Sequence, residues 1–281
     1  MISRISLVTS LLLVTMTQLS CHNHLAPGTA QAATNQPRVV IMFTSWNDPN
    51  EGGFRVNVPR GWQVSGGTTR TSDLDPHQVL RASDPDGAIQ ILLGDPGLLP
   101  RIGPSPMLEY GGIHEGQTIP SDAGVQLLVA SYQTGEQFVE SYVQDVLCPQ
   151  AQITSSNTLE EASRNLYEQA QEYGRATGAA AVEASVGEAS FSCGTQAGYV
   201  RASTVSGTSP MGAQVWSVLE LSGFLVNAAA DAPMAHYILN SVVSSLQIDP
   251  QWQQRQAQRS SDVTGAVFPE FFESQLAKRE F

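Results

Sequence analysis

The stretch GFRVNVPRGWQV, residues Gly53–Val64, decides the fold class. Apolar and polar residues alternate from Phe54 to Val58, which is the period of a strand with one buried face. Residues 59–61 follow, and they predict a turn because proline fixes φ and glycine tolerates positive φ. The alternation then resumes on a second strand. The residues predicted to face the core are Phe54, Val56, Val58, Trp62 and Val64.

Further strands and helices are predicted along the rest of the chain. Apolar or alternating runs predict strands at 39–43, 79–82, 88–93, 125–131, 188–193, 198–205 and 215–226. Helical spacing of apolar residues predicts helices over 138–147, 159–173 and 231–246, with Tyr237 and Val146 on apolar faces. Thr134 and Thr158 each have the spacing of a capping box. Residues 94–121 are dense in Gly and Pro, which predicts a long ordered loop or lid.

The order of these elements resembles the Mog1/PsbP-like superfamily. The corner Val58-Pro59-Arg60-Gly61-Trp62 is similar to the V/Y-P-x-G/x-W corner of that fold, and Glu136-Gln137-Phe138 is similar to its E-x-F helix start. The segment Val243-Ser244-Ser245-Leu246 is similar to the S-F that ends its last helix, with Leu for Phe. The resemblance implies an α+β fold, a central antiparallel sheet with helices on both faces.

On this resemblance the family domain covers residues 38–249, and a helix near 158–174 is an insertion. A polar, partly helical C-terminal tail is predicted over 250–281, including an amphipathic segment over Phe268–Phe281. Family members include periplasmic lipoproteins and an extrinsic photosystem subunit, which mostly dock on other proteins. The resemblance therefore implies docking in place of catalysis, although fold likeness carries function only by analogy.

The composition disfavours nucleic acid as a partner. The net charge is −12, and Lys278 is the one lysine in the chain. An acidic, lysine-poor surface repels phosphate backbones. No apolar run beyond the N-terminus reaches about 18 residues, so no internal membrane span is predicted.

The N-terminus predicts export across a bacterial membrane. Arg4 and the apolar run Leu7–Met16 form a signal peptide, predicted over residues 1–20. Ser20-Cys21 fits a lipobox, which predicts a lipid anchor on Cys21 and a flexible tether over 21–37. Ordinary cleavage after residues 30–32 and an uncleaved anchor are the alternatives. The predicted location is the bacterial envelope, in the periplasm or at the membrane surface.

Two cysteines remain after Cys21 is set aside. Cys148 and Cys193 form an even pair, and an exported protein meets oxidising conditions, so a disulfide is predicted. The alternative is two separate buried thiols. Cys193 as a nucleophile is a weaker interpretation, because no histidine lies near it in the sequence.

Candidate binding residues lie in two loops. Trp46, Asp48 and Glu51 belong to an acidic loop before the corner, whose oxygens would suit Ca²⁺ although their spacing is not that of an EF-hand. His114 and Glu115 lie in the Gly/Pro-rich loop. His114 would serve as a general base, since its pKa lies near neutrality, but adjacent residues of an extended chain point to opposite sides.

No catalytic residue, cofactor or metal site is predicted. The sequence contains no G-x-S-x-G motif and no phosphate-binding loop. Residues 21–24, Cys-His-Asn-His, hold metal-ligating types, but acylation would consume the cysteine. The predicted function is a membrane-tethered binding or assembly module that docks on a protein partner. The alternatives are an envelope enzyme using His114 and a carrier of an apolar small molecule.

The lipid anchor makes a direct prediction. Cys21→Ser removes the acylated thiol, so the protein should leave the membrane fraction and enter the soluble fraction. Detergent partitioning of wild type and variant measures this change. Unchanged partitioning of the variant would refute the anchor.

Overall fold

The computed structural model describes residues 40–72, 75–121, 124–177, 180–208 and 213–262. The predicted signal peptide, the tether over 21–37, Cys21, and the amphipathic segment Phe268–Phe281 lie outside these residues. From Ile41 on, the described residues are a mixture of strands and helices, and most strand neighbours are antiparallel, as an α+β fold requires.

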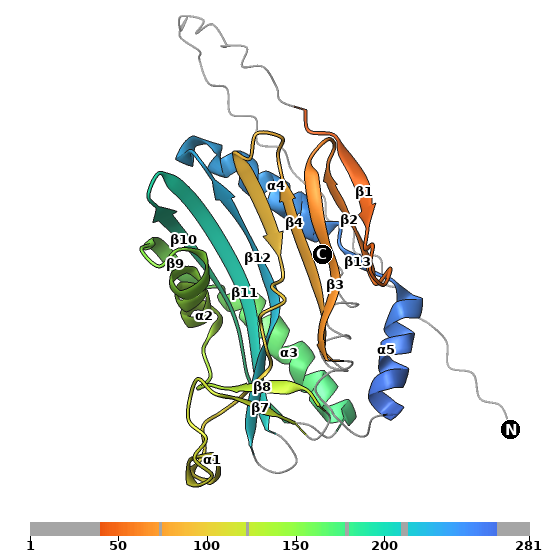
Figure 1. Ribbon diagram of the computed structural model, residues 1–281, viewed down its shortest axis with the longest axis vertical. Coiled ribbons are helices and arrows are strands. Elements are labelled where there is room, and N and C mark those ends of the chain that lie inside the picture. The colour runs from red at the N-terminus through yellow and green to blue at the C-terminus, as the bar shows by residue number, and fades with distance from the viewer. Residues whose placement is uncertain (1–39, 73–74, 122–123, 178–179, 209–212, 263–281) are drawn as a thin grey trace, which may run out of the picture. The chain divides into compact units, whose positions relative to one another are not determined.

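Two sheets form the framework (Figure 1). The main path of the large, curled sheet runs β3 (Gln63–Ser72), β4 (Asp75–Ser83), β5 (Ile89–Leu93), β12 (Gln214–Val226), β11 (Gln196–Thr208), β10 (Ala180–Cys193) and β9 (Gln152–Thr158). The small sheet has the order β1 (Phe43–Asn47), β2 (Phe54–Pro59) and β13 (Gln247–Ile248). Three short strands join the large sheet through β12, and they are β6 (Arg101–Ile102), β7 (Thr118–Pro120) and β8 (Gln126–Val129).

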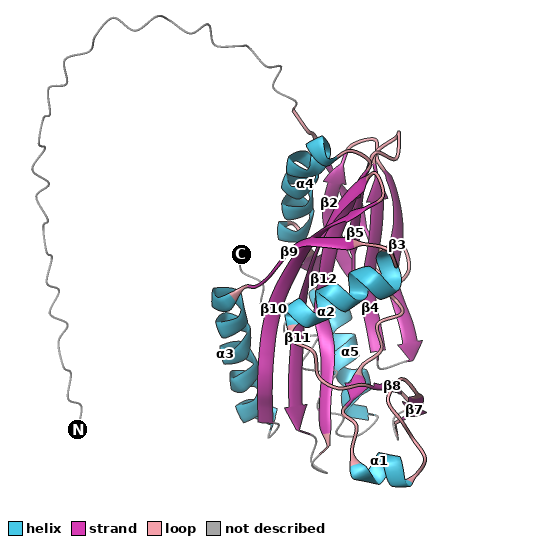
Figure 2. Cartoon of the chain, turned by 90° about the vertical axis from the view of Figure 1, so that its left-hand side faces the viewer, coloured by secondary structure: helices cyan, strands magenta, loops and turns pink. Residues whose placement is uncertain are grey.

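Helices lie on both faces of the large sheet (Figure 2). On one face lies α2 (Gly135–Tyr142), which continues as a π-helical turn over Val143–Leu147. On the other face lie α3 (Glu160–Thr177) and α4 (Ala232–Ser244), the latter preceded by a 3₁₀ turn over Ala229–Asp231. Two helices lie at the periphery, α1 (Pro106–Tyr110) and α5 (Pro250–Asp262).

The corner Val58–Trp62 joins the two sheets. Its strands are β2 and β3, as predicted, but they belong to different sheets and do not pair as a hairpin. The Trp62 amide donates to the Pro59 carbonyl at 3.3 Å, and Gly61 has a φ of 87°. Phe54, Val56 and Val58 are at most 3% exposed, so the alternation does mark a buried face.

Alternate residues along the strands of the large sheet pack in two separate cores, one on each face of the sheet. Ile91 and Tyr199 face α4, and they pack with Phe224 and the apolar side of that helix. Their neighbours Leu92 and Val200 face α2, and they pack in the second core with Phe138 and Trp216. The period of two along each strand therefore decides which helix each side chain meets.

A contact between two glycines positions α2 on the sheet. A Cβ at Gly187 of β10 would lie 2.0 Å from the Glu136 nitrogen, and a Cβ at Gly135 would lie 2.3 Å from the Gly187 nitrogen. No side chain fits in that space, so the first turn of α2 lies directly against the β10 backbone. The capping box predicted at Thr134 is present and begins the helix there.

The first predicted strand lies further along the chain than expected. The apolar run predicted a strand at 39–43, but β1 covers Phe43–Asn47 and so includes Trp46. Val40 and Met42 are 79% and 61% exposed, because only every second residue of the run turns toward the core. Pairing with β2, and not local hydrophobicity, decides where β1 begins.

Three predictions about residues in or beside the helices are wrong. Val146 is 56% exposed because the π-helical turn, closed by the Cys148 amide on the Val143 carbonyl, changes the angular spacing of the side chains. Thr158 is not the N-cap of α3, because it is the last residue of β9 and α3 begins two positions later at Glu160; its hydroxyl donates to the Glu136 carboxylate at 2.7 Å. Tyr237 of α4 is also exposed, at 56%, while Leu239 is buried in its place.

The predicted disulfide is present. Cys148, just after the π-helical turn, is bonded to Cys193 at the end of β10, and their Cα atoms are 6.2 Å apart. Cys148 is buried, and Cys193 packs against the core beneath α2. The disulfide therefore holds the C-terminal end of this helical segment on the sheet, while the glycine contact holds its N-terminal end.

The disulfide predicts a measurable loss of stability when it is removed. It closes a loop of 45 residues, and loop entropy assigns such a crosslink about 4 kcal/mol of unfolding free energy. Cys148→Ala/Cys193→Ala should therefore unfold at lower denaturant concentration, with a loss of about 2–4 kcal/mol. Wild type in reductant is the control, and a loss below about 1 kcal/mol in both samples would contradict the stabilising role.

Candidate functional site

Residues 101–120 project from the large sheet and are called the arm below. The arm contains β6, α1 and β7, and α1 lies beyond β7 and β8 at the end of the sheet (Figures 1 and 2). Ser105 caps α1, and Pro106 occupies its first turn, where proline is favoured. Of the arm residues from Pro104 to Pro120, none is buried. The predicted loop therefore has its own secondary structure but little core.

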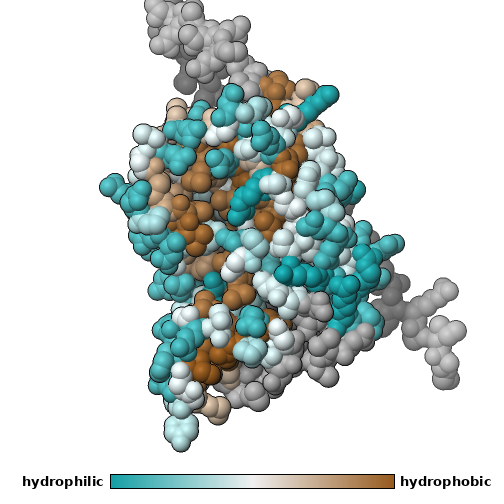
Figure 3. All heavy atoms as spheres, in the orientation of Figure 1, coloured by the Kyte–Doolittle hydropathy of each residue, from teal (hydrophilic) through white to brown (hydrophobic). Residues whose placement is uncertain are grey.

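The tip of the arm exposes two large side chains. Met107 is 85% exposed and Tyr110 is 96% exposed, and both lie on α1. Behind them, Leu108, Ile113 and Ile119 are half-buried. Figure 3 shows apolar residues gathered at the lower left, where the arm and β8 lie in the view of Figure 1. Exposed apolar groups in such a cluster mark a binding surface more often than isolated ones do.

The base of the arm is held by a buried arginine. The Arg101 guanidinium lies 4.5 Å from the ring centroid of Trp216 and 5.3 Å from that of Phe138. Its Nη1 group also donates to the Leu99 carbonyl at 3.1 Å. Burial lowers the pKa of Arg101 to about 10, which still leaves the group charged at neutral pH. Cation–π contacts of a desolvated guanidinium are worth about 2 kcal/mol or more.

Backbone hydrogen bonds fix the same base to β12 and β8. The Gly103 amide donates to the Gln214 carbonyl at 2.8 Å, and the Ala130 amide donates to the Ile102 carbonyl at 2.9 Å. The Trp216 indole donates to the Ala130 carbonyl at 2.9 Å. The arm is therefore anchored at its base by both β strands and the arginine, while its tip is exposed.

The predicted candidates His114 and Glu115 both lie on the exposed part of the arm. The Glu115 carboxylate accepts from the Ser131 amide at 2.7 Å, and this bond lowers the pKa of Glu115. The His114 amide donates to the Gln117 side chain at 2.9 Å. The described contacts include no hydrogen bond between Glu115 and His114, so the pair lacks the geometry of a general-base dyad.

The second predicted candidate region is the acidic loop that contains Asp48. Asp48 is a buried hydrogen-bond acceptor. Its Oδ1 accepts from the amides of Asn50 and Thr68, each at 2.9 Å. Its Oδ2 accepts from the Gly53 amide at 2.8 Å and the Thr68 hydroxyl at 2.6 Å. Burial alone would raise the pKa of Asp48, but these hydrogen bonds outweigh it and lower the pKa. The carboxylate oxygens are engaged within the protein, which supports a structural role.

Glu51 joins the loop to β3 and α5. Its carboxylate forms a two-pronged pair with Arg70, at 2.5 and 2.7 Å, and accepts from the Trp252 indole at 2.8 Å. The hydrogen bond from Arg70, which outweighs the effect of burial, lowers the pKa of Glu51. Arg70 also donates to Gln256 at 2.8 Å. Trp46 is half-buried and packs its ring 5.8 Å from that of Phe54.

The first part of the predicted polar tail is packed on the domain. The Trp252 amide donates to the Asp249 carboxylate at 2.7 Å, so Asp249 begins α5 and Pro250 follows in its first turn. Trp252 is 1% exposed, and a Cβ on Gly53 would lie only 2.9 Å from its ring. A glycine is therefore required where the indole meets the chain. Trp252 is buried against the domain although it lies in a Gln-rich stretch.

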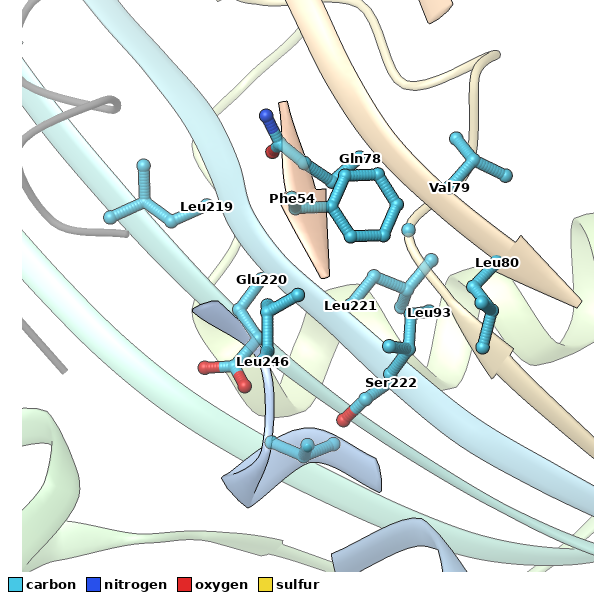
Figure 4. A pocket seen from close by; sticks show the side chains of 12 residues that line it. Phe54, Gln78, Val79, Leu80, Leu93, Leu219, Glu220, Leu221, Ser222 and Leu246 are labelled. Carbon is cyan, nitrogen blue, oxygen red and sulfur yellow. The ribbon is translucent and has the colours of Figure 1, made fainter. Parts of the chain in front are cut away.

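A small pocket lies on the face of the large sheet that carries α4 (Figure 4). It is called the sheet pocket below, and its volume is about 50 Å³. The apolar lining includes Phe54, Leu93 and Leu246, and the polar lining includes Gln78 and Glu220. Pockets that hold whole small-molecule ligands measure roughly 300–1,000 Å³, so this one suits a single side chain.

Metal and membrane features are absent from the described part of the chain. Within it, no three His, Cys, Asp or Glu side chains converge as metal ligands would. None of its helices combines the length and apolar character that crossing a membrane requires.

No protein-family model matches the chain. No curated protein matches it significantly in sequence.

The structure separates the five predicted binding residues into two groups. Trp46, Asp48 and Glu51 lie around the β1–β2 connection beside α5, and His114 and Glu115 lie on the arm (Figure 1). Their binding role stays a prediction. Sequence reasoning missed Met107 and Tyr110, whose only signal was two large side chains within a Gly/Pro-rich stretch. It also missed Arg101 and Trp252, whose partners lie far away in the sequence.

Asp48 predicts a pH-dependent stability difference. Hydrogen bonds to a charged acceptor contribute about 1.5–3 kcal/mol each, so Asp48→Asn should lose roughly 2–4 kcal/mol of unfolding free energy at pH 7. A carboxylate whose pKa is lowered on folding stabilises above its unfolded value, 3.8, and loses this contribution as the pH falls through the folded value. The difference between wild type and variant should therefore shrink below about pH 4.

Denaturant titrations at pH 7 and across the acid range measure this difference. Asp86→Asn is the matched control, since Asp86 is exposed and surface changes usually stay within about 0.5 kcal/mol. A loss at Asp48 equal to that of the control would contradict the structural role.

Proposed function

We propose that this chain is an exported, membrane-tethered binding module that docks on a protein partner of the bacterial envelope through the arm. The observation that carries the proposal is the exposure of Met107 and Tyr110 at the tip of an anchored projection. Tyrosine and methionine are both enriched at protein–protein interfaces. Their exposure leaves apolar surface in water that a partner would cover.

The anchored base favours the arm as the docking element. Ordering a mobile loop on binding costs about 0.5–1.5 kcal/mol for each side chain that is immobilised. Arg101, in contact with two aromatic rings, and the backbone bonds of Gly103 and Ala130 order the base before any partner arrives. The arm therefore presents its tip at a reduced entropic cost.

The chemistry of the arm indicates the chemistry of the partner. Glu109 and Glu115 are exposed beside the apolar tip, and the chain carries a net charge of −12. Opposite charges around an interface steer encounter and fix orientation. We expect a partner with an apolar pocket for the Tyr110 ring and a rim of basic residues.

The two alternatives draw less support from the geometry. An enzyme using His114 would need an orienting group and an enclosed site, but His114 is exposed and Glu115 is bound to Ser131. A carrier of an apolar molecule would need more room than the 50 Å³ of the sheet pocket. No described observation favours either alternative over docking.

The family and the location belong to the same proposal. The corner Val58–Trp62 and the helices on both faces of an antiparallel sheet support a Mog1/PsbP-like assignment. The signal-like Leu7–Met16 and the lipobox around Cys21 support a lipid anchor in the bacterial envelope. A tether over 21–37 would let the arm reach a partner at the membrane surface.

Removing the two exposed side chains tests the docking surface. Met107→Ala/Tyr110→Ala should weaken binding to the partner captured from the native envelope by at least about tenfold, because buried hot-spot residues contribute about 2 kcal/mol or more. The thermal midpoint should stay unchanged, since both side chains are exposed. Affinity capture followed by titration of the purified partner measures the effect.

Met42→Ala/Tyr237→Ala is the matched control, because these residues are of the same types and are 61% and 56% exposed elsewhere. The control should bind as wild type does. Equal capture of the same proteins by wild type, arm variant and control would contradict docking through the arm.

A further inference from the structure

The edge strand β9 presents unpaired backbone groups at one side of the large sheet. It pairs with β10, and no described strand lies on its other side (Figure 1). The Leu159 amide donates to the Val186 carbonyl, so by the alternation of an antiparallel ladder Asn157 also bonds to β10. The backbone amides and carbonyls of Ser156 and Thr158 therefore point outward from the sheet.

Strand β9 lacks the residues that usually protect such an edge. Its sequence, QITSSNT, contains no proline and no charged residue, which are the types that discourage pairing with another chain. The ladder with β10 has one irregularity, at Thr154, and is regular from Ser155 to Thr158. No residue of β9 is buried. An added strand therefore has access to the regular part of the edge.

Two carboxylates of α2 lie beside this edge. The Ser156 hydroxyl is within hydrogen-bond distance of Glu136 Oε1, at 3.1 Å, and of Glu140 Oε1. The Thr158 hydroxyl donates to Glu136 Oε2 at 2.7 Å. A serine hydroxyl carries one proton, so Ser156 donates to only one of the two carboxylates at a time. The other carboxylate can accept from a donor outside the chain.

The position of these carboxylates indicates the charge of the added strand. Residues directly opposite each other on paired strands point to the same face, with Cβ atoms about 4.5–5.5 Å apart. The residue opposite Ser156 would project toward Glu136 and Glu140, where a lysine or arginine forms a charge-assisted hydrogen bond. A second copy of this chain fits poorly, because pairing two β9 strands would bring the glutamates of both copies together.

We infer that β9 accepts an added β-strand from a partner protein, in the form of an extended segment that places a lysine or arginine opposite Ser156. Backbone hydrogen bonds to Ser156 and Thr158 supply the affinity, and the carboxylates of Glu136 and Glu140 select a basic segment. This surface is the edge of the sheet and not the arm, so either proposal can fail without the other.

Peptide binding to the full-length chain tests this inference. The probe is the acetylated peptide Thr-Val-Lys-Val-Lys-Val-Thr, and the matched control has glutamate at both lysine positions. The lysine peptide should slow hydrogen–deuterium exchange of the Ser156 and Thr158 amides, measured by NMR, because the added strand accepts from them. The Asn157 amide, already bonded to β10, should change little. The glutamate peptide should bind at least about tenfold more weakly.

Two variants test the groups that contact the peptide. Ser156→Pro removes an outward amide without removing a bond to β10, so it should abolish binding. Glu140→Gln should weaken binding of the lysine peptide by about fivefold or more, because it removes a charged acceptor. Glu168→Gln, at an exposed position of α3, is the matched control and should bind as wild type does. An unchanged thermal midpoint shows that each variant is folded.

Four outcomes would overturn the inference. The first two are equal binding of the lysine and glutamate peptides, and slowed exchange only at amides away from β9. The third is no slowing at Ser156 or Thr158 with about 1 mM lysine peptide, a concentration that detects even weak binding. The fourth is slowing at these amides that rises with protein concentration in the absence of peptide, which would assign the edge to a second copy.

Discussion

The close contact between Gly135 and Gly187 is the constraint on which the α2 face depends. It brings the first turn of α2 against β10, and the disulfide at Cys148 holds the other end of the same helical segment. In this position α2 presents Phe138 to the Arg101 guanidinium, which also lies over the ring of Trp216. The arm is therefore held by a sequence of contacts that begins with two residues that lack a side chain.

The carboxylates near the corner have a different role from the one their loop suggests. Asp48 accepts four close hydrogen bonds from residues of its own loop and β3, and Glu51 joins that loop to Arg70 and the Trp252 indole. A loop rich in Asp, Asn and Glu attracts a binding hypothesis from its composition alone. Here the polar groups connect the small sheet, β3 and α5.

The sequence patterns predicted the structural features that depend on residue spacing or on the compartment of the protein. The corner at Val58–Trp62, the capping box at Thr134 and the Cys148–Cys193 disulfide all follow from spacing or from the compartment, and all three are present. The burial of Arg101 depends on Phe138 and on Trp216, which lies more than one hundred positions away in the sequence. Alternation and capping signals carry no information about such partners, so the site had to come from the structure.

We propose that the arm is the docking surface. Hydrogen–deuterium exchange on the complex with the captured envelope partner tests it most directly, because backbone amides covered by a partner exchange more slowly. Docking through the arm predicts slower exchange over residues 106–117 in the complex than in the free protein, with no change over α3. Unchanged exchange across the arm, with slowing confined to another surface, would contradict it.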